Sequence, residues 1–372
     1  MKNFIIKHIH FFILLFFLFA WLYPVQNLTA ASATDSVKTE KTAKEFNPGE
    51  MIIDHVVDNH EWHILEWGET AVSVPLPVIL LDNGTIHTFF SSRFHHGTVS
   101  YEGYKLETEG NNKGKIVKVL PGTMETDKTA AIPLDFSITK TVLAMFFSMI
   151  LLMALFISVA NAYKRRPNQA PKKLQLWLEP VVLFIRDDIA IPSIGEKKYE
   201  RFMPYLLTLF TFILMNNLMG LLPFFPGGAN VTGNIAVTLV LAVFTFIITT
   251  VNGNKAYWKH IFNAPGVPWW LKFPIPLMPI VELVGVFTKP FVLMVRLFAN
   301  ISAGHIIILG FMSLIFIFGK MHWGLGLSVS VVSVAFTLFM SLLELLVALI
   351  QAYVFTLLSA LYFGMAMEEH HG

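Results

Sequence analysis

Apolar residues form long uninterrupted runs in the second half of the chain. Three runs approach the ~20 residues that a helix needs to cross the hydrocarbon core of a bilayer: 142–162, 202–225 and 235–251. Two longer runs cover 275–318 and 323–367, and as single helices each would be about 65 Å long. Only the short Lys320-Met321-His322 link separates them, which predicts a steeply tilted helical hairpin. We therefore expect an all-α polytopic membrane protein with about five membrane helices.

Basic residues cluster at alternate ends of these runs. Lys164-Arg165-Arg166 ends the first run, and the following amphipathic segment 172–189 is too short and polar to span, so we expect it at the membrane interface. Later loops on the same side carry further cations: Lys197, Lys198, Arg201, Lys255, Lys259 and Lys272. The loop 226–231 has no Lys or Arg. Loops rich in Lys and Arg stay on the cytoplasmic side of a membrane, so these loops are predicted to be cytoplasmic. After about five crossings the C-terminus is then cytoplasmic too, and we expect the protein in a bacterial inner membrane.

The N-terminal third reads differently from the rest. Residues 1–33 combine Lys2, the apolar run 11–23 and an Ala31-Ser32-Ala33 motif, which predicts a cleaved signal peptide, with an uncleaved anchor helix as the alternative. Residues 34–49 resemble a polar linker. We expect residues 50–135 to form a small β-rich domain outside the cytoplasm, followed by a membrane ion-channel domain over 138–372.

Alternation and turn signals support the β-rich prediction. Apolar and polar residues alternate in Val72-Ser73-Val74, as in a strand. The turn residues Asp82-Asn83-Gly84 before Thr85 indicate a β-hairpin. The region also holds six histidines, which raises the hypothesis of a metal site: His55, His60, His63, His87, His95 and His96. Their spacing matches no recognised motif, so we expect no metal and interpret them as solvated side chains.

Composition narrows the function classes. Apolar residues make up 55% of the chain and the formal net charge is only +2, which disfavours a soluble enzyme or a nucleic-acid-binding protein. The chain has no cysteine, which excludes disulfides, thiol nucleophiles and thiolate metal sites.

Ionisable residues within the two longest runs are few. They are Glu282, Lys289, Arg296, His305 and Glu344, with the amide Gln351 near the last. A charge at bilayer depth costs roughly 3 kcal/mol on insertion scales, so such residues usually face a protein interior or a water path and mark function. Arg296 has no acidic residue one turn away, so its partner must come from elsewhere.

Helical spacing predicts where these side chains point. Glu282 and Arg296 are about four turns and about 21 Å apart on one face, and Asn300 follows one turn later. His305 falls on the opposite side. Glu344 and Gln351 share a face of the second helix, and antiparallel packing would bring Glu344 beside His305. We expect one exposed face with a fixed cation and a separate buried polar track.

Four motifs resemble the subunit a family of F-type ATP synthases. They are the segments 291–305 around Arg296, 344–358 from Glu344, 217–223 from Asn217 and 232–238 from Thr232. The resemblance covers roughly 137–367 and leaves 34–135 without a counterpart.

The resemblance implies a non-catalytic ion-translocation subunit, with protons as the expected cargo and no cofactor. Arg296 matches the essential arginine that faces the carboxylates of a rotating c-ring, between two half-channels. The positions matching the outer half-channel are Asn300, His305, Glu344 and Gln351, and Glu282 matches an acidic position on the cytoplasmic path. The implied partners are the c-ring, peripheral-stalk subunit b, other ATP synthase subunits and membrane lipid.

Two alternatives belong to other classes. A secondary transporter with a midplane binding site predicts an inverted repeat, and the interfacial segment 172–189 has no counterpart near the C-terminus. An intramembrane hydrolase needs a metal motif or a nucleophile beside a base, and the spans contain no such spacing.

Overall fold

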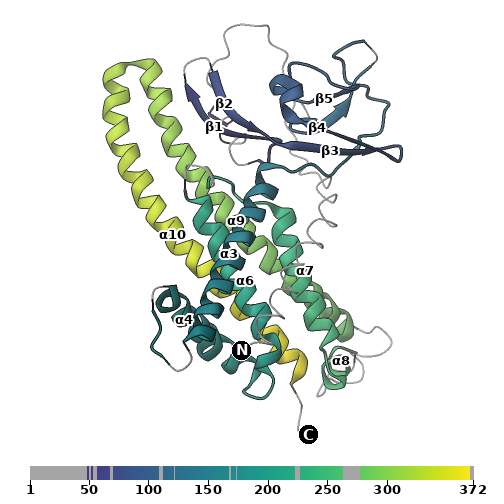
Figure 1. The fold of residues 1–372 in the computed structure, drawn as a ribbon, viewed down its shortest axis with the longest axis vertical. Helices are drawn as coiled ribbons and strands as arrows, with labels where there is room; N and C mark the ends of the chain where they lie inside the picture. Colours follow the sequence, from purple (N-terminus) through teal and green to yellow (C-terminus); the bar gives the residue numbers. More distant parts are fainter. Residues whose placement is uncertain are drawn as a thin grey trace.

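The computed structural model describes residues 48–49, 52, 57–67, 70–108, 112–120, 122–166, 169–172, 174–222, 227–262 and 277–368. The predicted signal peptide 1–33 and nearly all of the linker lie outside these residues, as do His55 and Lys272. The part described contains a β-rich N-terminal region at one end and a helical bundle below it (Figure 1).

Helices dominate the bundle. Within the described ranges, four helices are long and apolar enough to cross a membrane: α3 (Lys140–Arg165), α6 (Tyr199–Gly220), α9 (Leu277–Met321) and α10 (Trp323–Met367). A bent pair, α7 (Ile235–Val251) and α8 (Lys255–Phe262), adds a fifth if it counts as one span, with 103° between its halves. The prediction of about five membrane helices is thus supported by length and composition.

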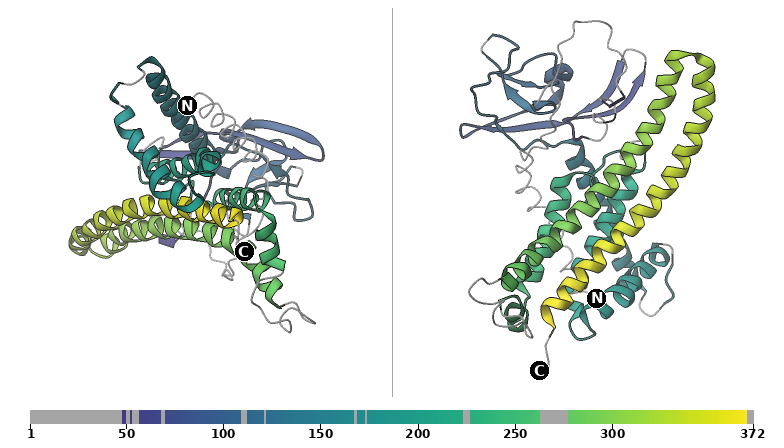
Figure 2. Two further views of the ribbon diagram at one scale, coloured as in Figure 1. Left: turned by 90° about the horizontal axis from the view of Figure 1, so that it is seen from below. Right: turned by 180° about the vertical axis from the view of Figure 1, so that it is seen from behind.

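The two longest helices form the predicted hairpin. Both have 45 residues, and only His322 separates them. The His322 side chain accepts a hydrogen bond from the Gly324 N–H at 3.1 Å and so caps the second helix. A Cβ on Gly326 would lie 2.6 Å from Gly319 Cα, so only glycine allows the helices to approach this closely at the apex. The apical part of the hairpin leans away from the other helices, while its lower part lies against them (Figures 1 and 2).

The segment predicted at the interface is helical but irregular. It comprises α4 (Leu174–Phe184), the π-helical turn η4 (Ile185–Ala190) and α5 (Ile191–Ile194). Pro180 and Pro192 each lack the N–H that a regular helix needs. Leu176 and Trp177 are exposed, as expected for apolar side chains that face the interfacial region of a membrane.

Helix α6 forms the centre of the bundle. Its side chains are mostly buried, and it packs against α10, α3 and η4, while α9 packs against α10 and α7. Phe202 and Tyr205 of α6 contact Phe363 of α10, with ring centroids 5.0 and 5.6 Å apart. This packing fixes the depth of α10 relative to α6.

The described residues of the N-terminal region contain seven short strands in three small sheets. The antiparallel pair β1 (Glu61–Trp67) and β2 (Thr70–Pro75) is one sheet, and β5 (Tyr104–Leu106) with β6 (Ile116–Lys118) is another. In the third sheet, β3 (Pro77–Asp82) lies between β4 (Thr85–Phe90) and β7 (Leu134–Asp135). Asn83 and Gly84 have positive φ at the β3–β4 turn, which confirms the predicted hairpin.

One face of the β3–β4–β7 sheet packs on a small core. Val78 and Leu80 of β3 are fully buried in a cluster with Phe94 of the 3-10 helix η2 (Ser91–Gly97), Tyr104 and Ile116. This core lies between the sheet and the β5–β6 pair and holds the two together.

The β-rich region is joined firmly to the first spanning helix. Thr139 caps α3 and donates a hydrogen bond to Asp58 at 2.7 Å, and the Thr141 N–H donates to the same carboxylate at 3.0 Å. His60 pairs with Asp135 at 2.7 Å. The interpretation of the histidines as solvated is therefore wrong for His60, which is only 5% exposed and bonds the half-buried Asp135 carboxylate.

Candidate functional site

Arg296 lies on the exposed face of α9. Leu293 and Leu297 beside it are buried against the bundle, so the arginine points the other way, as helical spacing predicts. Within the part of the chain that the structure describes, no carboxylate lies within 4.0 Å of its guanidinium. Asn300 is exposed one turn further along. This face therefore carries a cation without a carboxylate partner among the described residues, although Tyr362 of α10 lies within electrostatic range of it.

His305 and Glu344 meet on the other side of the hairpin. His305 Nδ1 and a Glu344 carboxylate oxygen are hydrogen-bonded, which confirms that the two residues are neighbours. The Glu344 side chain is only 3% exposed. A Cβ on Gly220 of α6 would lie 3.6 Å from His305 Nε2, so the imidazole packs against α6.

The second carboxylate oxygen of Glu344 has no hydrogen-bond partner among the described residues. Asn216 Oδ1 of α6 is buried and unsatisfied in the same way. Buried polar atoms without a partner are uncommon and are usually satisfied by ordered water. Glu344 and Asn216 thus each present a buried acceptor that an ordered water would satisfy.

Glycine makes the contact between α9 and Glu344 possible. A Cβ on Gly304 would lie 3.0 Å from both Cδ and Oε1 of Glu344, tighter than ordinary van der Waals contact. Sequence reasoning did not assign this role to Gly304. A glycine within an apolar helix beside a polar residue was the available signal, because such positions often serve close approach.

Asn217 links three segments behind this pair. Its amide donates to the Ala348 carbonyl of α10 at 3.1 Å and accepts from the Thr232 hydroxyl at 2.5 Å. The Ser302 hydroxyl of α9 donates to the Gly233 carbonyl at 3.2 Å. Asn217 and Thr232 were noted only as motif residues, and their joint role requires a contact that sequence spacing does not reveal.

The remaining predicted site residues are separate from the His305–Glu344 pair. Gln351 is buried on α10 two turns from Glu344, on the predicted face. Glu282 is half-buried near the start of α9. Tyr257 of α8 lies close enough to Glu282 to interact electrostatically. Glu282 thus lies near the N-terminal end of α9, 23 residues before His305.

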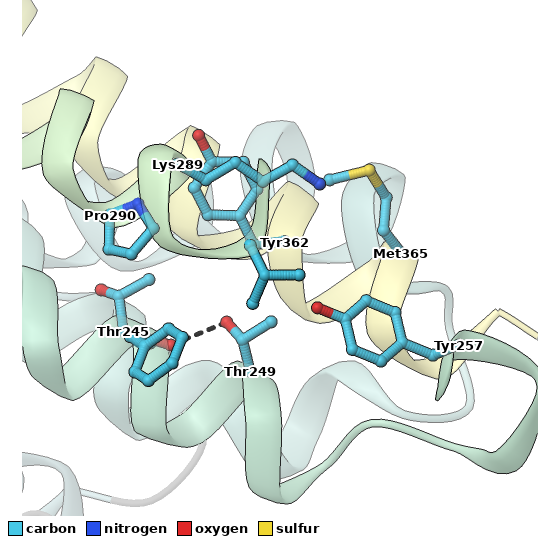
Figure 3. A pocket seen from close by; sticks show the side chains of 9 residues that line it. Thr245, Thr249, Tyr257, Lys289, Pro290, Tyr362 and Met365 are labelled. Atoms are coloured by element: carbon cyan, nitrogen blue, oxygen red, sulfur yellow. Dashed lines mark hydrogen bonds between the residues drawn. The ribbon is translucent and has the colours of Figure 1, made fainter. Parts of the chain in front are cut away.

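A small cavity lies between α7, α8, α9 and α10 near that end (Figure 3). Its volume of ≈ 20 Å³ has room for about one water. The lining includes Lys289, whose ammonium is 5.7 Å from the centre of the Tyr362 ring. Tyr257, Thr245 and Thr249 add hydroxyl groups. Sequence reasoning noted Lys289 without a role, and the cavity itself needed the folded arrangement.

A further buried polar cluster connects α6, α7 and α10 beside this cavity. The hydroxyl of Thr245 lies 2.7 Å from the Tyr205 hydroxyl and 3.1 Å from the Ser359 hydroxyl. All three side chains are buried. The cluster satisfies its own hydrogen bonds, and we assign it to helix packing within the bundle.

The fold and this arrangement define a multi-pass membrane protein with an exposed fixed cation and a buried polar track. A family model described as ATP synthase A chain matches residues 142–364. The chain belongs to the ATP synthase subunit a family. It is therefore a non-catalytic membrane subunit of that complex, with other ATP synthase subunits as its partners.

Curated relatives give the same result. The chain is 46% identical over 245 residues to ATP synthase subunit a of Chloroherpeton thalassium, covering 64% of this chain and 69% of the relative. It is 46% identical over 246 residues to ATP synthase subunit a 2 of Prosthecochloris aestuarii, covering 64% and 72%. With ATP synthase subunit a of Myxococcus xanthus the identity is 45% over 247 residues, covering 64% and 76%.

A second family model matches the N-terminal region. It covers residues 51–136 and is described as a domain of unknown function, DUF8433. The β-rich region is thus similar to a domain for which the match supplies no role.

Proposed function

We propose that this subunit carries ions, most simply protons, between two aqueous half-channels and the carboxylates of a rotating c-ring, with Arg296 as the fixed cation between the half-channels. The observation that carries the proposal is the position of Arg296 along α9. Lys289 and its cavity lie seven residues before it, and His305 lies nine residues after it, about 10 and about 13 Å along the axis.

The exposed face of α9 supplies the ring-facing surface. An arginine without an acidic partner at bilayer depth is costly, so its retention favours a partner in another chain. A carboxylate near the middle of a ring helix would meet this need. The opposite charge within a few ångströms would lower the pKa of that carboxylate by about one to three units and hold it ionised.

Arginine suits this position better than lysine. The guanidinium keeps its charge in a low-dielectric site, whereas a lysine there can lose its proton. A permanently charged group also repels a proton that would pass directly between the half-channels. A ring carboxylate that has been neutralised by an ion can instead turn into lipid, so rotation becomes the only route.

His305, Glu344 and Gln351 are proposed to line the half-channel toward the hairpin apex. Histidine and glutamate in contact can exchange a proton because burial and the partner charge can bring both into a range near neutral pH. Asn300, on the same face as Arg296, would lie between this track and the ring. The unpartnered oxygen of Glu344 supports a hydrated path.

The half-channel at the other end is proposed to pass the Lys289 cavity and Glu282. Its hydroxyl groups and ammonium could hold water in an otherwise apolar helix bundle. The cavity lies toward α8, whose Lys255 and Lys259 are on the side that charge distribution predicts to be cytoplasmic.

The same charge distribution supports a complete orientation. Lys164, Arg165 and the C-terminal end of α10 are at the end of the bundle opposite the β-rich region (Figure 1). We therefore infer a cytoplasmic C-terminus and a β-rich domain outside a bacterial inner membrane. Membership of the subunit a family, rather than charge, is the reason to propose a peripheral-stalk subunit b among the partners.

Purification of the tagged chain from gently solubilised membranes tests the proposal. It should be recovered with a ring-forming subunit and the catalytic head, in a complex that pumps ions on ATP addition. Recovery as a monomer or homodimer that transports a solute by itself would instead support a secondary transporter.

A further inference from the structure

The β3–β4–β7 sheet has a second face that does not contact its core. We call this the outer sheet face, and define it as the side opposite Val78 and Leu80. Leu134, Leu81 and Ile86 lie side by side across the three strands on this face. Ile86 is 70% exposed and Leu134 is 44% exposed. Large apolar side chains that gather on an exposed sheet face mark an interaction surface.

The apolar surface continues along the sheet to the membrane helix. The N–H groups of Phe136 and Ile138 donate to the carbonyls of Ile79 and Pro77, at 2.8 and 3.0 Å, so the pairing with β3 extends beyond β7. Phe90 pairs opposite Pro77 and is 57% exposed.

These pairings give the outer sheet face three rows of three positions. Strand alternation places every second residue of each strand on it. Thr88, opposite Ile79, is the one polar position, and no charged residue occurs. An uncharged face of this kind is unusual on a surface that meets water alone.

The position of this face relative to the membrane is fixed by the chain itself. Ile138 is two residues before the start of α3, and the apolar run of that helix begins at Val142. Phe90 is two strand spacings from Ile138, which is about 10 Å. The hydrogen bonds of Asp58 with Thr139 and Thr141 hold the domain against the helix N-terminus.

The outer sheet face is turned toward the membrane end of the molecule. In Figure 1, β3 and β4 lie between β5 and the helices, so the face opposite the core looks toward the bundle. The β3–β4 hairpin also projects sideways beyond α7 in Figures 1 and 2.

From these observations we infer that the outer sheet face rests on the bilayer surface and inserts Ile86, Phe90 and Leu134 into the boundary between headgroups and acyl chains. The occupant is lipid because the sheet continues directly into a spanning helix and because its face is apolar, uncharged and exposed. The domain is thus a membrane-surface module that braces the first spanning helix, in addition to any contact it makes with protein.

The absence of native cysteine allows a direct test with the full chain. Ile86→Cys and Phe90→Cys variants would each be labelled with an environment-sensitive fluorophore and reconstituted into phosphatidylcholine vesicles. Ser92→Cys, at an exposed position of η2 just beyond β4, is the matched control. Nitroxide groups on the lipid, placed either at the headgroup or high on the acyl chain, serve as quenchers.

We expect severalfold stronger lipid quenching at positions 86 and 90 than at 92, together with blue-shifted emission. Because the contact is apolar, quenching should be unchanged by high salt or by added anionic lipid. Equal quenching at all three positions would overturn the inference. So would blue-shifted labels at 86 and 90 without lipid quenching, because that result indicates that protein covers the face.

Discussion

Gly304 of α9 lies directly against the carboxyl group of Glu344 on α10. A Cβ at this glycine would be 3.0 Å from the carboxyl carbon, which leaves no room for a side chain without moving Glu344. The acid can bond His305 because the preceding residue of α9 has no side chain. The position of the Glu344 carboxyl group thus depends on Gly304, a residue without a side chain.

Gly304→Ala should therefore reduce ion conduction without preventing insertion. The added methyl group displaces the Glu344 carboxyl from His305, while the helix itself gains about 1 kcal/mol in propensity. Passive proton flux through reconstituted membrane sectors without the catalytic head is the measurement. Gly310→Ala, on the same helix, is the control, because a Cβ at this glycine would meet nothing within 4 Å. Equal flux in both variants would show that this contact does not matter.

Glu344→Leu should assemble but conduct poorly, and the exchange His305→Glu with Glu344→His should conduct better than either single change. The exchange retains an acid and a base in contact, whereas leucine removes the titratable group. A purely structural ion pair predicts the opposite, because apolar residues of similar size often replace such pairs without loss. The same passive flux assay decides. Full flux in Glu344→Leu would remove Glu344 from the path.

Arg296→Lys should abolish coupled ATP synthesis while leaving the protein inserted. Lysine retains a cation, but in a low-dielectric site it can lose its proton and lacks the planar fork of the guanidinium. ATP synthesis driven by an imposed proton gradient, in inverted membrane vesicles, is the readout. Lys320→Arg, near the end of α9, is the control for replacing one basic side chain by the other, and ATP synthesis should be unaffected by it. Normal ATP-driven pumping in Arg296→Lys would contradict the assigned role.

The β-rich domain should lose stability as the pH rises above the ordinary pKa of histidine. Burial opposes the charged imidazolium of His60, but the hydrogen bond and charge of Asp135 outweigh it and raise the pKa of His60. Burial likewise opposes the Asp135 carboxylate, yet His60 and Ser137 lower the pKa of Asp135. The contribution of His60 to the free energy of unfolding is complete below pH 6.5 and is lost as the pH rises through its raised pKa. The contribution of Asp135 is complete above about pH 4 and is lost as the pH falls through its lowered pKa.

Resistance of residues 57–135 to proteolysis, measured from pH 4 to 9 on the purified chain, should therefore be highest between about pH 4 and 6.5. The His60→Gln variant should be less resistant to proteolysis at pH 5, and its resistance should decline less steeply above pH 6.5. His95→Asn is the matched control, because asparagine tolerates the positive φ of 44° at that exposed position. An unchanged profile in His60→Gln would exclude the His60–Asp135 pair as its cause.

The orientation can be tested in intact cells. Protease added to spheroplasts should trim the region 34–135, and the mature chain should begin near Thr34 if Ala31-Ser32-Ala33 is a cleavage site. The loops around Lys164 and Lys255 should be protected until the membrane is opened. Protection of the β-rich domain together with an N-terminus at Met1 would contradict both the topology and the signal peptide.

The sequence alone determined the features that depend on neighbouring residues. Hydrophobic run length predicted the spans and the hairpin, and turn chemistry predicted the β3–β4 turn at Asn83 and Gly84. The 3.6-residue period placed Arg296 on a face opposite His305. These predictions succeed because backbone geometry and the cost of exposing polar groups to lipid operate over a few turns of one helix.

Only the tertiary structure decided how distant segments fit together. Helix spacing placed His305 and Glu344 at similar depths, but their bond and the space supplied by Gly304 depend on the relative sliding of two 45-residue helices. Asn217 meets Ala348 across 131 positions, and His60 meets Asp135 across 75. Such contacts arise from side-chain shapes packed to high density, and shape complementarity between remote segments has no signature in local sequence.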